Sequence, residues 1–215
     1  MDKDKKEVLR ERLIIFTRYP EPGKTKTRMI PALGASGAAE LQRRMTEHTL
    51  SEIKELKAWR SLSVEVHFNG GDQQLMAQWL GSELAYRKQS EGDLGRRMTS
   101  AFETSFAAGM TRVVIIGTDC PGLNAKLISQ ALQALAEHDL VLGPARDGGY
   151  YLIGLRRLFP ELFIGISWGT SEVRQQTLEI AENLNLEIAQ LAPLTDVDRP
   201  EDLWVVSNFN WSESE

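Results

Sequence analysis

Short apolar runs alternate with longer stretches of helical periodicity along most of the chain. The longer stretches predict helices at 36–59, 93–108, 124–137, 171–183 and 200–207, and a short one that ends near residue 80. The apolar runs predict strands at 13–16, 62–68, 84–86, 112–117, 140–142, 150–155 and 187–191. Strands and helices that alternate on this scale predict a mostly parallel central sheet covered on both faces, which is a three-layer α/β/α sandwich.

The predicted strands should differ in depth. The run 112–117 is apolar at successive positions, as a central parallel strand must be. In the run 62–68 apolar residues alternate with polar ones, among them Glu65 and His67. This alternation predicts a half-exposed strand near an edge of the sheet.

Length and composition favour one globular domain. The chain has 215 residues, 42% of them hydrophobic and 26% charged, which is close to the average of soluble domains. We therefore expect a single domain over 1–215, with loose termini at about 1–11 and 208–215.

Charge and cysteine usage limit which partners and which cellular compartment the sequence predicts. The formal net charge is -5, which argues against a nucleic-acid partner because such partners require a broad basic surface. Cys120 is the single cysteine, so no disulfide can form within the chain. No apolar run approaches the roughly 20 residues of a membrane span. The first twelve residues lack the apolar stretch of a signal peptide, so we expect a cytoplasmic protein.

In a parallel sheet, ligands bind beyond the carboxyl ends of the strands, and a basic loop follows the first predicted strand. Its cations and its glycine are Arg18, Gly23, Lys24, Lys26 and Arg28. Cations on a loop stiffened by two prolines suit a diphosphate or triphosphate, although a solvated basic loop would have the same composition. The loop is not a P-loop, because Arg18 stands where that motif requires glycine.

Acidic residues follow three further strands. Asp119 comes two residues after 112–117 and could bind Mg²⁺ or Mn²⁺, or cap the turn into the next helix. Asp147 precedes two glycines, in a pattern that also fits a hairpin turn. Asp196 and Asp198 are two residues apart, so in an extended segment both could approach one cation, while Asp198 could instead cap the helix that begins near Pro200.

The remaining candidate site residues have weaker support from the sequence. Trp168 lies among flexible polar residues and could line a pocket. Cys120 has no visible histidine partner for a nucleophilic pair. His48 and His138 fall on predicted helices as surface residues, and the histidines show no spacing typical of metal ligands.

Five motifs in this order resemble the nucleotide-diphospho-sugar transferase fold, and within it the bacterial glycosyltransferase-A-like group called domain of unknown function 2064. They are Pro22–Arg28, Gln89–Met98, Gly117–Pro121, Asp147–Leu155 and Asp196–Asp198. The resemblance covers nearly the whole chain. Glycosyltransferases of this fold commonly carry D-x-D, whereas this chain has one acid at Thr118-Asp119-Cys120-Pro121. That departure makes it more similar to the guanylyltransferases of molybdenum-cofactor and phospholactate chemistry.

The resemblance implies roles for particular residues. The basic loop would contact nucleotide phosphates, Asp119 and Asp198 would hold Mg²⁺ or Mn²⁺, and Asp147, Gly148 and Trp168 would line the acceptor side. Asp119 and Asp147 are then the candidate catalytic residues.

We therefore expect a metal-dependent nucleotidyltransferase or glycosyltransferase that acts on a nucleotide or nucleotide-sugar and an unknown acceptor. The alternative is a non-catalytic nucleotide-binding or partner-binding protein that keeps the fold. The sequence leaves the base, the sugar, the acceptor and a homodimer open.

Overall fold

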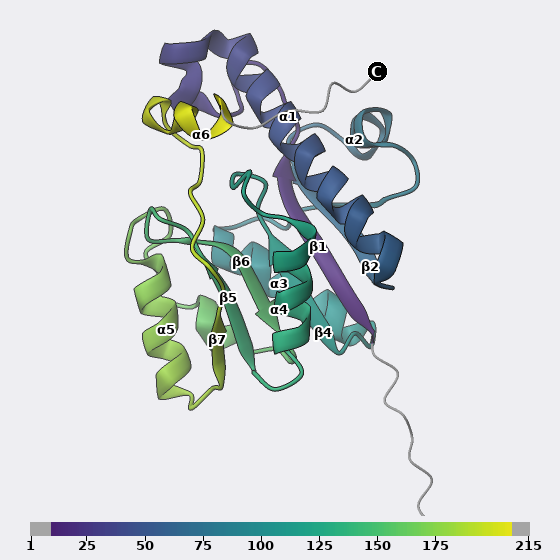
Figure 1. The fold of residues 1–215 in the computed structure, drawn as a ribbon, viewed down its shortest axis with the longest axis vertical. Helices are drawn as coiled ribbons and strands as arrows, with labels where there is room; N and C mark the ends of the chain where they lie inside the picture. Colours follow the sequence, from purple (N-terminus) through teal and green to yellow (C-terminus); the bar gives the residue numbers. More distant parts are fainter. Residues whose placement is uncertain (1–9, 208–215) are drawn as a thin grey trace, which may run out of the picture.

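A mixed seven-stranded sheet organises the molecule (Figure 1). The computed structural model describes residues 10–207. The spatial order of the strands is β3-β2-β1-β4-β6-β5-β7. Their bounds are β1 Glu11–Arg18, β2 Ser63–Asn69, β3 Ala85–Lys88, β4 Arg112–Ile116, β5 Leu140–Pro144, β6 Tyr150–Leu155 and β7 Ile188–Gln190.

Within this sheet β6 alone runs against its neighbours. It pairs antiparallel with both β4 and β5, whereas the remaining neighbouring strands pair in parallel. The cause is local, because the turn at Asp147 and Gly148 sends the chain directly back along β5. The mostly parallel sheet is thus confirmed, and the carboxyl ends of six strands meet the start of β6 at one edge.

Helices cover both faces of the sheet. The helices α1 and α4, with α2, pack on the face formed by Leu13 and Ile15. The helices α3 and α5 pack on the opposite face, against Ile14. Their bounds are α1 Ile30–Trp59, α2 Gln73–Leu80, α3 Leu94–Ala107, α4 Ala125–Ala134, α5 Val173–Asn183 and α6 Leu203–Ser207, with 3-10 turns η1 Thr27–Met29, η2 Pro160–Phe163 and η3 Pro200–Asp202.

Helix boundaries follow capping chemistry. Asp93 accepts a hydrogen bond from the amide of Arg96, and Asn124 accepts one from Leu127, so these side chains cap α3 and α4. Gly34 has φ 69°, which breaks α1 after its first residues. A small apolar cluster at this end joins α1 to α6 and includes Val197.

Two sequence predictions about exposure were wrong. Residue 11, expected in a loose terminus, belongs to β1, where the Glu11 carboxylate pairs with Arg60 and Arg112. The polar face of β2 is buried, because the Glu65 carboxylate pairs with Arg12, His67 and Arg87. This strand lies one place inside the sheet edge, with β3 beyond it. The predicted loose segments 1–9 and 208–215 lie outside the described residues.

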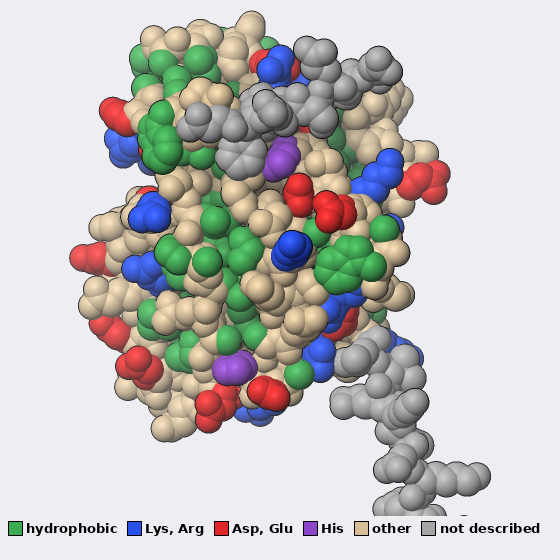
Figure 2. All heavy atoms as spheres, viewed as in Figure 1, with side chains coloured by type: hydrophobic (Ala, Val, Ile, Leu, Met, Phe, Trp, Pro, Cys, Tyr) green, Lys and Arg blue, Asp and Glu red, His purple; other side chains and the backbone are tan. Residues whose placement is uncertain are grey.

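The face of the molecule drawn in Figure 2 has mixed charge. Figure 2 shows acidic and basic side chains interspersed over the visible face, with no broad basic patch. Within residues 10–207, no helix has the length and apolarity that crossing a membrane requires.

Candidate functional site

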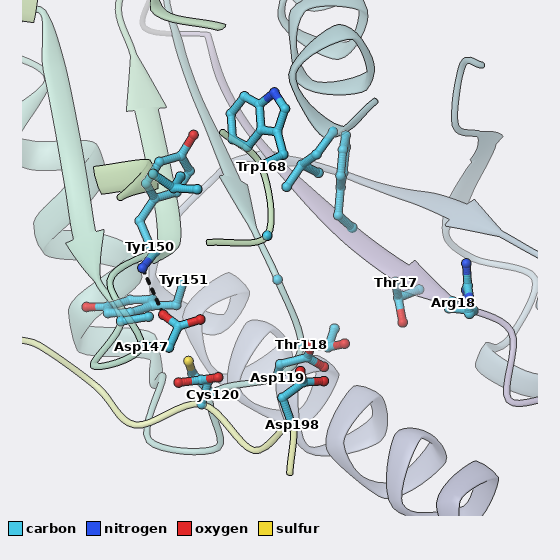
Figure 3. A pocket seen from close by; sticks show the side chains of 18 of the residues that line it. Thr17, Arg18, Thr118, Asp119, Cys120, Asp147, Tyr150, Tyr151, Trp168 and Asp198 are labelled. Atoms are coloured by element: carbon cyan, nitrogen blue, oxygen red, sulfur yellow. Dashed lines mark hydrogen bonds between the residues drawn. The ribbon is translucent and has the colours of Figure 1, made fainter. Parts of the chain in front are cut away.

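A cavity of about 460 Å³ opens at the carboxyl edge of the sheet, where the sequence places its candidate residues. Its walls come from the segments that follow β1, β4 and β5, from the loop before α5, and from residues 196–198 (Figure 3). The predicted site residues that line it are Arg18, Arg28, Asp119, Asp147, Trp168 and Asp198.

The basic loop is held in a fixed shape. The Thr25 hydroxyl is fully buried and donates to the carbonyl of Tyr19, and the Arg18 guanidinium donates to the carbonyl of Lys24. Lys26 has φ 47° and ψ 44°, a left-handed conformation that is uncommon outside glycine. This conformation turns the Lys26 side chain inward, while Lys24 points outward and pairs with Glu21.

A cation and two carboxylates meet beside the cavity. The Lys26 ammonium lies 2.9 Å from Asp119 Oδ1 and 3.8 Å from Asp198 Oδ1, and it donates to the carbonyl of Val197 at 2.6 Å. Arg28 pairs with the other oxygen of Asp198. The Lys26 side chain is 3% exposed, whereas Asp119 is 49% and Asp198 33% exposed. The two acidic side chains are therefore partly exposed at the cavity, although both oxygens of Asp198 face a cation.

Backbone contacts fix the segment that carries Asp119. The amide of Val197 donates to the carbonyl of Asp119 at 2.8 Å, which ties residues 196–198 to the end of β4. The His48 ring bonds to the carbonyl of Pro121 at 2.9 Å, so His48 is a half-buried brace and not the surface residue expected. Cys120 is buried, and burial beside Asp119 raises the pKa of its thiol, which agrees with an unreactive role.

Neither acid caps a helix. Asn124 caps α4, so Asp119 is left for another role. At η3, the carboxylate of Asp202 accepts from the amides of Asp198 and Arg199. The capping role considered for Asp198 was therefore wrong, because the Asp198 carboxylate faces Lys26 and Arg28 instead.

Asp147 and Gly148 form the hairpin turn between β5 and β6. Asp147 Oδ1 accepts from the amide of Gly149 at 2.8 Å, the bond drawn in Figure 3. Gly148 has φ +95°, and a Cβ there would lie 2.1 Å from the carbonyl oxygen of Ser171. Gly148 thus lets the turn press against the loop before α5, and its carbonyl accepts from the amide of Arg174.

Trp168 forms the wall opposite the acids (Figure 3). A Cβ on Gly95 would lie 2.8 Å from both Cζ2 and Nε1 of its indole, so the ring lies directly over the first turn of α3. This close approach explains why Gly95 occurs inside a helix, where glycine ordinarily costs about 1 kcal/mol.

Sequence reasoning missed the polar floor of the cavity. The Gln42 amide donates to the hydroxyls of Thr17, Thr46 and Thr118, which joins α1 to the ends of β1 and β4. Gln42 falls in a plain helical pattern, so no signal pointed to it. Gln89 and Arg97 also line the cavity, and their motif was noted in the sequence without a role.

Four predicted residues lie around the cavity without lining it: Gly23, Lys24, Lys26 and Gly148. Gly23 and Lys24 belong to the outer side of the basic loop, where a Cβ on Gly23 would meet nothing. Lys26 lies behind Asp119, and Gly148 lies behind the turn. Asp196 does line the cavity, and burial together with Asp147 raises the pKa of its carboxyl.

The donor set fits a hard divalent cation that also binds substrate. Among residues 10–207, no three histidine, cysteine or acidic side chains are arranged as a complete metal site. Mg²⁺ usually takes one or two protein carboxylates and completes its shell with water and phosphate oxygens. Asp119 and Asp198 supply that number and both line the cavity, and a cation bound to Asp198 would take the place of its ion pairs with Lys26 and Arg28.

Sequence comparison places the chain in a family. The model of an uncharacterized protein conserved in bacteria (DUF2064) matches residues 52–170. A crystal structure from Desulfovibrio desulfuricans G20, provisionally identified as a nucleotide-diphospho-sugar transferase, is 36% identical, with a TM-score of 0.86 over 95% of this chain and 89% of that one. The chain belongs to the DUF2064 family. No curated protein matches it significantly.

More distant structures share the fold of this DUF2064 protein. The 4-diphosphocytidyl-2C-methyl-D-erythritol synthase of Anaerococcus prevotii has a TM-score of 0.59 at 11% identity, over 92% of this chain and 94% of that one. Glucosyl-3-phosphoglycerate synthase of Mycobacterium tuberculosis, in complex with Mn²⁺, UDP and phosphoglyceric acid, has a TM-score of 0.56 at 13% identity, over 93% and 74%. At these identities the likeness shows the nucleotide-diphospho-sugar transferase fold alone.

Proposed function

We propose that this DUF2064 protein is a metal-dependent transferase that acts on a nucleotide, with nucleotidyl transfer as its reaction. The observation that carries the proposal is the meeting of Lys26, Asp119 and Asp198 at the carboxyl edge, with both acids lining the cavity. Asp119 and Asp198 would hold Mg²⁺ or Mn²⁺. When bound, the ion would neutralise the charge of the phosphates and of the leaving group.

The basic residues beside the acids would bind phosphate. Arg18, Arg28 and Arg97 all line the cavity. Guanidinium groups bind phosphate oxygens in pairs and stabilise charge that develops on a leaving group. Replacement of Arg18 or Lys26 should therefore weaken nucleotide affinity.

In nucleotidyl transfer, an oxygen of the acceptor phosphate attacks the α-phosphorus. The bond from the α-phosphorus to the bridging oxygen breaks, and pyrophosphate leaves. An anionic acceptor phosphate needs no base, which agrees with the single acid that follows β4 in Thr118-Asp119-Cys120.

Glycosyl transfer is the second candidate, and the acids at the acceptor side favour it. An acceptor hydroxyl would attack the sugar carbon, the bond to the diphosphate oxygen would break, and the hydroxyl proton would pass to a base. Asp147 lines the cavity and is exposed, so its carboxylate could accept that proton.

Calorimetric titration with GTP, CTP, UTP, ATP and UDP- and GDP-sugars, each with and without Mn²⁺ or Mg²⁺, tests the proposal. Metal-dependent binding of a triphosphate supports nucleotidyl transfer and identifies the base. Metal-dependent preference for a sugar nucleotide supports glycosyl transfer. Nucleotide binding that needs no metal, together with a lack of turnover, favours a non-catalytic binding protein. No binding of any of these nucleotides contradicts both enzymatic proposals.

A further inference from the structure

The Lys26 ammonium lies where a cation between Asp119 and Asp198 would lie. Its oxygen neighbours are the Val197 carbonyl at 2.6 Å, Asp119 Oδ1 at 2.9 Å and Asp198 Oδ1 at 3.8 Å. These are the same two carboxylates that the proposed function assigns to the metal. Arg28 also pairs with Asp198, through Oδ2, but among the described residues Lys26 is the cation that contacts both acids. A metal ion held between Asp119 and Asp198 would therefore be repelled most directly by the Lys26 ammonium.

The loop is built to keep Lys26 there. Of residues 10–207, only Lys26 and Asn185 are non-glycine residues with positive φ. Such strain persists where the surroundings enforce it, and it often marks functional sites. Here the surroundings are the buried Thr25 hydroxyl bond to Tyr19 and the Arg18 bond to the carbonyl of Lys24.

We infer that Lys26 is the built-in counter-cation of the acid pair, and that a divalent metal must displace its ammonium to bind Asp119 and Asp198. The inference rests on the proposed function, because it takes these acids as the metal ligands. It follows that the protein alone binds metal weakly. Nucleotide phosphates would offer the flexible Lys26 side chain a new anionic partner and offer the metal further oxygens, so metal and nucleotide should each raise the affinity for the other.

The test is titration of the full chain with Mn²⁺ alone, with free Mn²⁺ measured by electron paramagnetic resonance. Lys26→Met removes the charge and keeps the length of the side chain, and it should bind Mn²⁺ at least tenfold more tightly than the wild type. Lys26→Arg keeps a cation and should stay weak. Lys24→Met is the matched control, because it removes a charge from the same loop at a side chain that pairs with Glu21; its Mn²⁺ affinity should not change.

An Mn²⁺ affinity of Lys26→Met that equals or falls below that of the wild type overturns the inference. Circular dichroism checks that the variant is folded, and Lys26→Gln replaces it if it is not. A gain that persists in the double variant Lys26→Met/Asp119→Asn also overturns it, since the metal would then bind elsewhere. The nucleotide titrations of the wild type separate the two proposals. If the wild type binds nucleotide in a metal-dependent way but Lys26→Met does not bind Mn²⁺ more tightly, the counter-cation role is rejected and the proposed transferase function is retained.

Discussion

Ion-pair clusters lie at both ends of β1 and β4, and they are built in opposite ways. At the amino end, the Glu11 carboxylate is 5% exposed and pairs with Arg60 and Arg112, each 16% exposed. At the carboxyl end the buried group is the cation, because Lys26 is 3% exposed while Asp119 is 49% and Asp198 33% exposed.

The difference separates a cluster that stabilises the fold from one that can bind a ligand. Both oxygens of Glu11 accept hydrogen bonds from Arg60, at 2.6 and 2.7 Å, and Arg112 adds a third at 3.3 Å. Such an acid has no oxygen to offer a ligand. At the other end Lys26 contacts Oδ1 of Asp119, and among the described residues no ion pair involves Asp119 Oδ2, which remains available. Asp198 is partly exposed but faces Lys26 through Oδ1 and Arg28 through Oδ2.

The largest effect should come from breaking the amino-end cluster. Glu11→Gln leaves Arg60 and Arg112 without their buried anion, and the free energy of unfolding should fall by about 3–5 kcal/mol. Urea denaturation measures the loss. The nucleotide affinity of the folded variant should not change, and a reduced affinity would show that the two ends are not independent.

Asp119→Asn should produce the reverse pattern. Metal-dependent nucleotide affinity should fall at least 100-fold by calorimetry, because one of two proposed metal carboxylates is lost. The free energy of unfolding should fall by less than in Glu11→Gln, since the Asp119 side chain is half exposed and the buried Lys26 ammonium keeps Asp198 and the Val197 carbonyl as partners. Wild-type affinity in this variant would remove Asp119 from the site.

Gly148→Ala should disturb the carboxyl end through the backbone. Its Cβ would lie 2.1 Å from the Ser171 carbonyl oxygen at φ +95°, and a forced shift of this kind costs about 2 kcal/mol. Gly149→Ala is the matched control, because its nearest neighbour, Asp147 Oδ1, is 3.2 Å away. Thermal unfolding should show the larger loss for Gly148→Ala, and equal losses would contradict the close contact.

Acid titration should reveal the buried acid of β2. The hydrogen bond from His67, and the charges of Arg12 and Arg87, hold the pKa of Glu65 below its ordinary value of 4.5 despite burial. A lowered pKa in the folded state gives stability that is present above pH 4.5 and is lost as the pH falls through the folded value. Urea midpoints below pH 4.5 should therefore fall more steeply for the wild type than for Glu65→Gln.

The smallest effect should come from Asp196, which lines the cavity, and its replacement should stabilise the protein instead of destabilising it. Burial and the charge of Asp147 raise the pKa of Asp196 above its ordinary value of 3.8, so its ionised form destabilises the fold at neutral pH. Asp196→Asn should raise the melting temperature slightly at pH 7, and the gain should vanish as the pH falls to 3.8. A lower melting temperature at pH 7 would contradict this account.

Local patterns predicted most of the fold, because each element carries its own signal. The apolar run 112–117 forms β4, and the helices predicted at 93–108 and 124–137 appear as α3 and α4. The prediction that β2 is half-exposed failed because the partners that bury Glu65 include residues far away in sequence, on β1 and β3. Periodicity alone carries no information on such partners.

The candidate site could be predicted only in part. The prediction that residues following the strands meet at the carboxyl edge of the sheet was right for Arg18, Asp119, Asp147 and Asp198, since parallel strands end at the same edge. The inward turn of Lys26 and the outward turn of Lys24 depend on one left-handed residue, which the sequence does not reveal. Gln42 reaches the floor only through tertiary packing.

Paramagnetic broadening by Mn²⁺ tests the central claim most directly. The amide signals of the ¹⁵N-labelled protein would be recorded with Mn²⁺ and whichever nucleotide binds most tightly. If Asp119 and Asp198 hold the ion, signals of residues 117–120 and 196–199 should broaden first, while those of Glu11 and Arg112 stay sharp. Broadening that centres on another part of the molecule, or none at all, would contradict a metal site at the carboxyl ends of the strands.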